Sequence, residues 1–227
     1  KKELKEICLL DQVYVKAEDG KQSVGNYVAQ VAAQAMDTKA TDIEGFLADT
    51  WSLDTTKTVN EELASQIAVI GENLKIRRFA QVEENNGFVA DYVHMGGKIG
   101  VLVEAATDVV NDDIKEALKN VAMQIAALHP QYVCDSEVPE EFKEHEIEII
   151  KAQIANDPKV AGKPEKVIEG MIQGKLNKEL KEICLNDQVY VKAEDGKQSV
   201  AAYLAQVGKA NNANLSVKKF VRFERGE

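Results

Sequence analysis

The chain has 227 residues, 44% of them hydrophobic, and a net charge of −10. This length allows one large domain or two modest ones, and the hydrophobic share is ordinary for a globular protein. The acidic balance argues against a general nucleic-acid binder, because neutralising phosphates requires clustered Lys and Arg. It suits a protein whose partner has a basic or mixed surface.

The three cysteines, Cys8, Cys134 and Cys184, lack the spacing of a metal site such as CxxC. Their odd number and wide spacing indicate a reduced, cytoplasmic setting without a structural metal. No apolar run approaches the roughly 18–20 residues that cross a bilayer, and no signal peptide is recognisable, so we expect no membrane contact. Because the chain begins with Lys1 rather than Met, we expect a fragment or a processed form.

The N-terminal segment is repeated almost letter for letter, since residues 2–31 recur at 178–207. We interpret the match as a recent duplication, an engineered graft or a sequence-assembly artefact, and residues 1–31 as a segment of uncertain placement. Two nearly identical segments can compete for one docking site. The copies differ at the pairs Leu10/Asn186, Gly25/Ala201, Asn26/Ala202 and Val28/Leu204.

The first third of the chain is predicted to form helices that begin at Ser or Thr. Side-chain oxygens of these residues accept backbone N–H groups that the first helical turn leaves without partners. Two of the helices begin with capping-box patterns, Thr41 to Glu44 and Thr58 to Glu61, and Gly71 ends the last one. Trp51 lies between them, and we expect it to anchor a core. The predicted helices span residues 23–36, 41–47 and 58–70.

Three strands are predicted next, over residues 73–83, 88–95 and 98–105. Gly96 and Gly97 separate the last two strands and suit a two-residue type I′ turn, which needs positive φ at both positions. The sequence therefore predicts an antiparallel sheet of at least three strands.

A helix over residues 112–129 follows, with apolar residues at helical spacing and Pro130 at its end. We expect it to cover one face of the sheet. Another helix begins at Ser199 and runs to about residue 211. The final basic stretch, residues 214–224, resembles residues 73–83, as two half-domains of one ancestor would, and each copy is predicted to end in a basic edge strand.

Residues 139–177 carry two polar helices with narrow apolar seams, which is typical of an antiparallel coiled-coil hairpin. A narrow seam is not buried on every side by one neighbour, so part of it is expected to meet another protein. The seam residues proposed to mediate self-association, and hence a homodimer, are Ile150, Ile154, Ile168 and Ile172.

Motifs for catalysis are absent: the sequence contains no GxSxG, GxGxxG or HExxH pattern. Residues 96–100 superficially resemble a phosphate loop but lack its spacing and join two strands. The histidines His94, His129 and His145 have no second ligand at metal spacing, and a structural or surface role is favoured for each. We therefore predict no enzymatic activity, no metal and no cofactor.

Several motifs, in order along the chain, resemble those of bacterial elongation factor Ts, the guanine-nucleotide exchange factor for elongation factor Tu. IGENLKIRRF at residues 70–79 carries most of the likeness, and the resemblance covers about residues 32–227. The other matching stretches are YVH before GG at 92–97, KIGVLV at 98–103, VAMQIAA at 121–127, PQY at 130–132, MIQGKL at 171–176 and FVRFERG at 220–226.

The resemblance implies an α+β fold with two related subdomains of small antiparallel sheet plus helices, and a protruding antiparallel coiled-coil hairpin. It implies exchange without covalent chemistry, in which the factor binds the nucleotide-free GTPase better than the GDP form. The expected divisions are 32–84 for the remnant of the first core subdomain, 85–138 for the second, 139–177 for the hairpin, and 178–227 for the return to the second subdomain.

Elongation factor Tu is therefore the expected partner, and the hairpin tip between the second and third predicted strands is the expected contact. The residues assigned to this contact are Tyr92, His94, Gly96 and Gly97, with Met123 and Gln124 in addition. A structural or assembly module that self-associates through the hairpin is the alternative function.

The chain departs from the family pattern in its N-terminal part. The N-terminal helical domain is missing, and so is the Thr-Asp-Phe-Val segment, whose Phe acts as a wedge near the magnesium site. The nearest match, residues 107–110, carries Val109 where Phe is needed. We therefore expect binding with weak or absent GDP release.

Overall fold

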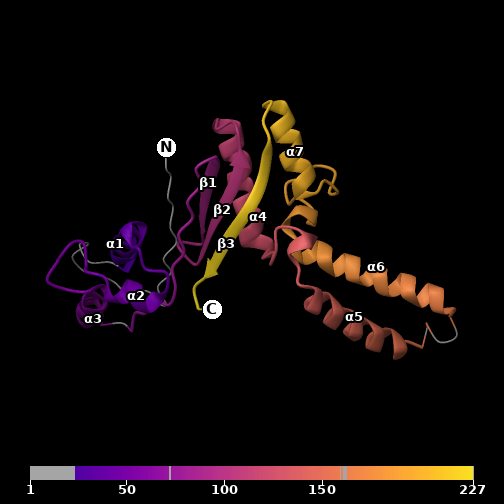
Figure 1. Ribbon diagram of the computed structural model, residues 1–227, viewed down its shortest axis with the longest axis horizontal. Coiled ribbons are helices and arrows are strands. Elements are labelled where there is room, and N and C mark those ends of the chain that lie inside the picture. The colour runs from indigo at the N-terminus through magenta and orange to yellow at the C-terminus, as the bar shows by residue number, and fades with distance from the viewer. Residues whose placement is uncertain (1–23, 72, 159, 161–162, 227) are drawn as a thin grey trace.

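The structure is a computed structural model that describes residues 24–71, 73–158, 160 and 163–226 (Figure 1). Its helices and a three-stranded antiparallel sheet confirm the predicted α+β class. The helices are α1 (Val24–Asp37), α2 (Ile43–Ala48), α3 (Val59–Ile70), α4 (Asp112–Leu128), α5 (Glu140–Ala155), α6 (Glu165–Ile183) and α7 (Val200–Ala210), with short 3-10 turns at Asp135–Glu137 and Leu185–Asp187. The strands are β1 (Gly87–His94), β2 (Ile99–Thr107) and β3 (Leu215–Glu224).

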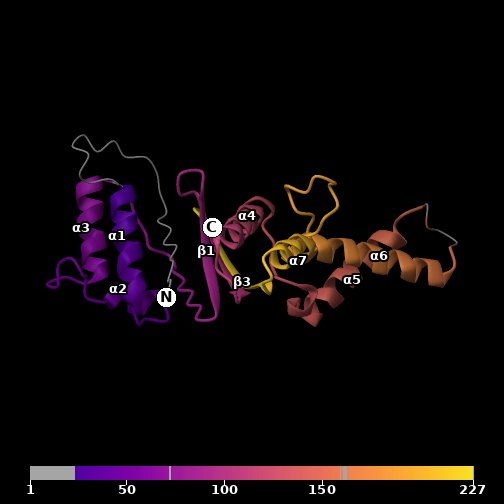
Figure 2. The ribbon, with the colours of Figure 1, turned by 90° about the horizontal axis from the view of Figure 1, so that it is seen from above.

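The sheet has the order β1-β2-β3, with both neighbours antiparallel. Figure 2 shows it nearly edge-on, with α4 and α7 on one side and α1 and α3 on the other. The main core lies between the sheet and α4, as predicted for the helix over 112–129. Val101 and Val103 of β2 meet Leu118, Val121 and Ile125 of α4 there, and all five side chains are fully buried.

The predicted two-residue turn between β1 and β2 is wrong. His94 pairs with Ile99, so four residues, 95–98, connect the strands. The His94 carbonyl accepts hydrogen bonds from the N–H groups of Gly97, at 3.2 Å, and Lys98, at 3.0 Å. Met95, Gly96 and Gly97 all have positive φ, which widens the loop beyond the two glycines.

The predicted strand over residues 73–83 is also wrong, whereas the related stretch 214–224 forms β3. Leu74 and Ile76 are buried in a helical cluster with α1 and α3 instead of on a sheet. Gln81 Nε2 then donates to the carbonyl of Ala35 at 2.7 Å, which ties the extended chain to the end of α1. Alternating apolar residues form a strand only where a partner strand is available. Here helices α1 and α3, and not a second strand, pack against the apolar side chains.

The first lobe, α1 to α3, has its own hydrophobic cluster. Trp51 is 2% exposed, which confirms its predicted core role, and it packs with Tyr27 and the fully buried Phe46. Asp42 rather than Thr41 caps α2, because its Oδ1 accepts the N–H of Gly45 at 2.7 Å. The capping box of α3 is present as predicted, from Thr58 to Glu61.

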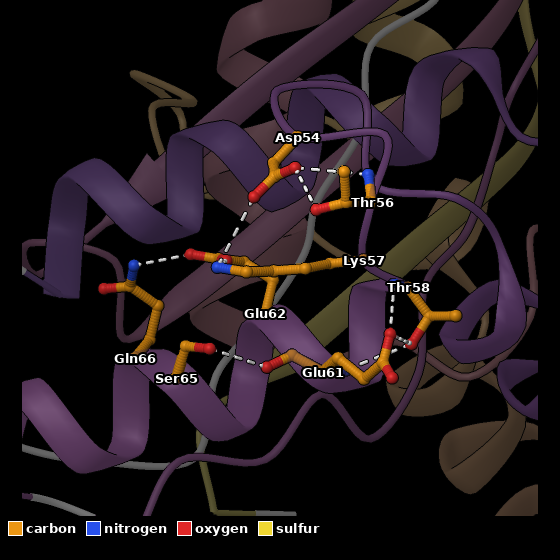
Figure 3. A network of polar contacts seen from close by, with 8 residues as sticks. All are labelled: Asp54, Thr56, Lys57, Thr58, Glu61, Glu62, Ser65 and Gln66. Carbon is orange, nitrogen blue, oxygen red and sulfur yellow. Dashed lines mark hydrogen bonds and ion pairs between the residues drawn. The ribbon is translucent and has the colours of Figure 1, made fainter.

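A polar network holds the start of α3 to the loop before it (Figure 3). Lys57 Nζ lies 2.9 Å from Glu62 Oε2 and 3.6 Å from Asp54 Oδ2. Gln66 Nε2 donates to the other Glu62 oxygen at 2.7 Å. Glu62 is nearly buried, so these contacts compensate the cost of removing its carboxylate from water.

The first lobe is joined to the sheet through the extended segment before β1. Val82 packs with Val89 and Leu102 on the sheet face opposite α4. The Arg78 guanidinium lies 4.5 Å from the centre of the Phe223 ring. Both contacts fall on the side of the sheet where Figure 2 places the first lobe.

A loop and the helix after it have the same backbone pattern in both lobes. The Trp51 N–H donates to the carbonyl of Lys57 before α3, and the Tyr190 N–H donates to that of Gln198 before α7, each at 2.8 Å. Isolated bridges flank both loops, Thr50↔Thr58 and Val189↔Ser199. This shared loop and helix add to the resemblance of 73–83 to 214–224, and the division into two related subdomains stays a prediction.

A buried glutamine on an earlier helix, α1 or α4, holds each of these loops. Gln34 on α1 is 7% exposed and Gln124 on α4 is 0% exposed. Each side-chain amide donates to the carbonyl before the loop aromatic and accepts from the N–H after it. The distances are 3.1 Å to Thr50 O and 2.8 Å from Ser52 N for Gln34, and 3.0 Å to Val189 O and 2.8 Å from Val191 N for Gln124.

Helices α5 and α6 form a hairpin that projects away from the sheet (Figure 1). Ile150, Ile154, Leu176 and Leu180 are buried along their seam. Helix α6 continues to Ile183, beyond the predicted end of the hairpin at 177. Supercoiling of the pair stays a prediction. Within the described ranges, no helix has the length and apolar character needed to cross a membrane.

Candidate partner-binding site

The tip of the β1-β2 hairpin presents an aromatic pair. Tyr92 and His94 are alternate residues of β1, so both side chains lie on the face of α4. The Tyr92 ring packs against the main core, and its Oη lies 2.9 Å from His94 Nδ1. The partly buried tyrosine therefore orients an exposed imidazole, which can donate or accept according to its tautomer.

Gly96 and Gly97 have φ values of 64° and 92°. A Cβ built at either position meets no atom within 4 Å. The need for glycine is therefore conformational, because an L-residue is strained at these angles even in open space. A substitution at Gly96 or Gly97 therefore alters the backbone conformation of the tip rather than a side-chain contact.

Two other chain segments reach the same end of the sheet. The Arg225 N–H donates to the Lys98 carbonyl at 2.8 Å, which places the end of β3 beside the tip. The Arg222 guanidinium, 2.6 Å from Glu224, is the largest cause that lowers the pKa of that carboxyl group. Lys98 and His129 lower this pKa further, so the C-terminal end of α4 also lies near this cluster.

Of the two α4 residues assigned to the contact, neither has an exposed side chain. Gln124 is fully buried, and its amide is used by the loop that contains Tyr190. Met123 is half-buried in the middle of the helix. We therefore leave Gln124 out of the contact surface and assign it to the fold.

The seam residues assigned to self-association lie between the two hairpin helices. Ile150 is fully buried and Ile154 is 4% exposed, while Ile168 and Ile172 are half-buried beside them. The more exposed apolar side chains are Ile149 at 38% and Val167 at 44%. A second chain would therefore contact these outer residues. Self-association itself stays a prediction.

Two further observations concern groups that could bind a metal or react as a nucleophile. Among the residues that the structure describes, no group of three or more His, Cys, Asp or Glu side chains could hold a metal ion. Cys184 at the base of the hairpin is fully buried, and burial raises the pKa of its thiol to about 11. That thiol is consequently a packing group at neutral pH.

Sequence reasoning missed Met95, which lies between His94 and the glycines. Its φ is 49° and its side chain is 65% exposed. Nothing in the sequence indicates a left-handed methionine, because the glycines alone suggest the turn. The glutamine clamps were missed too, although VAAQAM at 31–36 and VAMQIA at 121–126 place Gln at matching positions.

Comparison with known proteins gives one consistent result. Residues 21–227 match the family described as Elongation factor TS. The Elongation factor Ts of Clostridium perfringens (strain 13 / Type A) is 40% identical over 201 residues, which cover 88% of this chain and 64% of that protein. The one of Clostridioides difficile (strain 630) is 43% identical over 201 residues, which cover 88% of this chain and 63% of its own length. This chain therefore spans less than two thirds of these relatives.

Proposed function

Since the chain belongs to the elongation factor Ts family, we propose that it is a guanine-nucleotide exchange factor that binds elongation factor Tu in the cytoplasm during translation. The observation that carries the proposal is the family match over residues 21–227. The exposed tip with its oriented histidine supports a role in binding. The protein would act by contact and make no covalent bond itself.

The thermodynamic requirement for such a factor is simple. It must bind the nucleotide-free GTPase more tightly than the GDP-bound form, and GDP must weaken its binding by the same factor. The residues proposed to contact the GTPase are Tyr92, His94, Gly96 and Gly97, with half-buried Met123 as a further candidate.

We expect the chain to bind elongation factor Tu but to accelerate GDP release only weakly. The family's Thr-Asp-Phe-Val segment is missing from this sequence, and we do not transfer the wedge role to the nearest match, residues 107–110, which carries Val109 where Phe is needed. Thr107 Oγ1 donates to the Val109 carbonyl at 2.8 Å, so the segment forms a tight turn after β2. A half-buried valine in that turn is a poor substitute for an inserted aromatic ring.

The test is release of a fluorescent GDP analogue from elongation factor Tu of Clostridium perfringens, with and without this chain. We expect measurable binding to the nucleotide-free GTPase, with release slower than that driven by the complete Elongation factor Ts of the same organism by on the order of tenfold. His94→Ala should weaken binding, and Lys209→Ala, at an exposed position of α7, serves as the control. Failure of the unsubstituted chain to bind the nucleotide-free GTPase would contradict the proposal.

The second candidate is a structural module that forms a homodimer through the hairpin. Exposed Ile149 and Val167 on α5 and α6 support it. Light scattering of the double variant Ile149→Glu, Val167→Glu should then report a smaller species than the unsubstituted chain. These positions are better than the buried Ile150, where a charge would disrupt the hairpin itself. An unchanged mass would remove this candidate.

A further inference from the structure

Met95 has a backbone conformation that disfavours its own residue type. Its φ of 49° is left-handed, and in that region the Cβ of an L-residue crowds the following carbonyl oxygen. Gly96 and Gly97 beside it have φ of 64° and 92° without this cost. A third glycine would relieve the loop, so the methionine is costly to the fold.

The fold does not recover this cost by packing the side chain. Met95 is 65% exposed, and it belongs to none of the hydrophobic clusters that the described residues form. Neighbouring Val93 is 58% exposed as well. Strained residues that a structure retains without an internal benefit are concentrated at binding and switch sites.

The surroundings of this apolar tip are basic although the chain as a whole is acidic. Lys98 completes the loop, and the exposed Arg225 lies beside it through the 2.8 Å hydrogen bond to the Lys98 carbonyl. The Glu224 carboxylate there is paired with Arg222 at 2.6 Å. An apolar side chain surrounded by charged groups has the anatomy of an interface centre with a polar rim.

We propose that Met95 is the apolar anchor of this surface and inserts into a hydrophobic pocket with an acidic rim on the partner GTPase. The flexible, polarisable thioether suits such insertion, and Lys98 and Arg225 supply the complementary rim charges. The inference rests on the proposed function, because it assigns the anchor of that same interface.

The test separates folding from binding by means of three variants. Met95→Gly removes both the strain and the anchor, Met95→Leu keeps strain and apolar volume, and Asn212→Gly relieves another left-handed residue, with φ of 51°, in the turn between α7 and β3. Thermal melts and affinity for nucleotide-free elongation factor Tu are measured for each, together with the unsubstituted chain.

We expect Met95→Gly to raise the melting temperature by about 1–3 °C while weakening the affinity by about tenfold or more. Met95→Leu should bind within about threefold of the unsubstituted chain, and Asn212→Gly should leave affinity unchanged. Lys98→Glu should weaken binding, with a smaller loss at high salt.

Two results would overturn the inference while the proposed function stands. One is unchanged affinity of Met95→Gly when the unsubstituted chain binds. The other is a lower melting temperature for Met95→Gly, which would make Met95 a structural residue. Absence of binding by the unsubstituted chain would instead overturn the proposed function, and the inference with it.

Discussion

At the scale of single residues, burial decides which functional groups of this chain can react. Cys184 has a fully buried side chain, and Cys134 at the other side of the hairpin base is partly exposed. The nucleophile in alkylation is the thiolate. Burial raises the pKa of the Cys184 thiol to about 11, so both access and ionisation oppose its reaction.

We expect iodoacetamide at pH 7.5 to label Cys134 in the native protein and to leave Cys184 unmodified. Tryptic peptide masses report each site, and Asn186 gives the Cys184 peptide a mass different from that of its N-terminal copy, which has Leu10. In guanidinium chloride both cysteines should react. Equal native rates at Cys134 and Cys184 would show that the hairpin base opens readily.

The same pKa has a consequence for stability. Because the folded state holds the Cys184 proton more tightly than the unfolded chain does, this group favours folding below the ordinary thiol pKa. Its contribution is lost as the pH rises from that value towards about 11. The variant Cys184→Ala, which keeps a small apolar group at this position, should not show this loss of stability at high pH.

At the scale of elements, the two glutamine clamps make a unit of helix, loop and second helix in each lobe. Gln34 and Gln124 each bond two backbone groups that flank a buried aromatic residue. Replacing the amide with an apolar side chain of similar size leaves those backbone groups without partners. The loss of such buried hydrogen bonds costs about 1–3 kcal/mol.

We therefore expect Gln34→Leu and Gln124→Leu each to lower the melting temperature by several degrees, at about 2–4 °C per kcal/mol for a chain of this size. Trp51, the single tryptophan, lies in the loop that Gln34 holds. Its fluorescence should shift to the red in Gln34→Leu and not in Gln124→Leu. Gln173→Leu on the exposed surface of α6 is the matched control, and equal melting of all three variants would contradict the clamp.

The elements differ in how far the sequence alone could predict them. The apolar period of 112–128 and the Thr58–Glu61 capping box are local signals, and both appear as predicted. The stretches 73–83 and 214–224 have similar sequences but different structures, because only the second finds a partner strand in β2. The local pattern favours an extended backbone, and the tertiary context decides whether that backbone pairs with a neighbouring strand.

The residues of the candidate site also differ in how far the sequence alone could predict them. Exposure of His94 and the glycine conformations follow from the hairpin pattern. The left-handed φ of Met95 and the burial of Gln124 depend on how loop and lobe close in three dimensions. The helical period alone does not separate Gln124 from a surface residue, since it lies in an ordinary amphipathic helix.

At the scale of the whole molecule, three of the hydrophobic clusters formed by the described residues mark a helical lobe, a sheet lobe and the hairpin. The hairpin cluster is built from α5, α6 and the segments at their base, and its seam is filled by its own helices. Glu146 on α5 interacts with Glu179 on α6, so the two helices lie close together at that level. The tip of the β1-β2 hairpin belongs to the sheet lobe.

Shortening the hairpin tests this division. When residues 148–178 are replaced by a short Gly-Ser linker, the buried seam residues Ile150, Ile154 and Leu176 are removed together, whereas Leu180 is kept in the base of the hairpin. The shortened chain should still unfold in one cooperative transition, and should bind nucleotide-free elongation factor Tu within about threefold of the full chain. An affinity within this range would mean that the sheet lobe makes the contact with the GTPase. A loss of tenfold or more would mean that the hairpin itself contacts the GTPase. A drop in molecular mass by light scattering beyond that of the deleted residues would instead identify the hairpin as the joint between two copies.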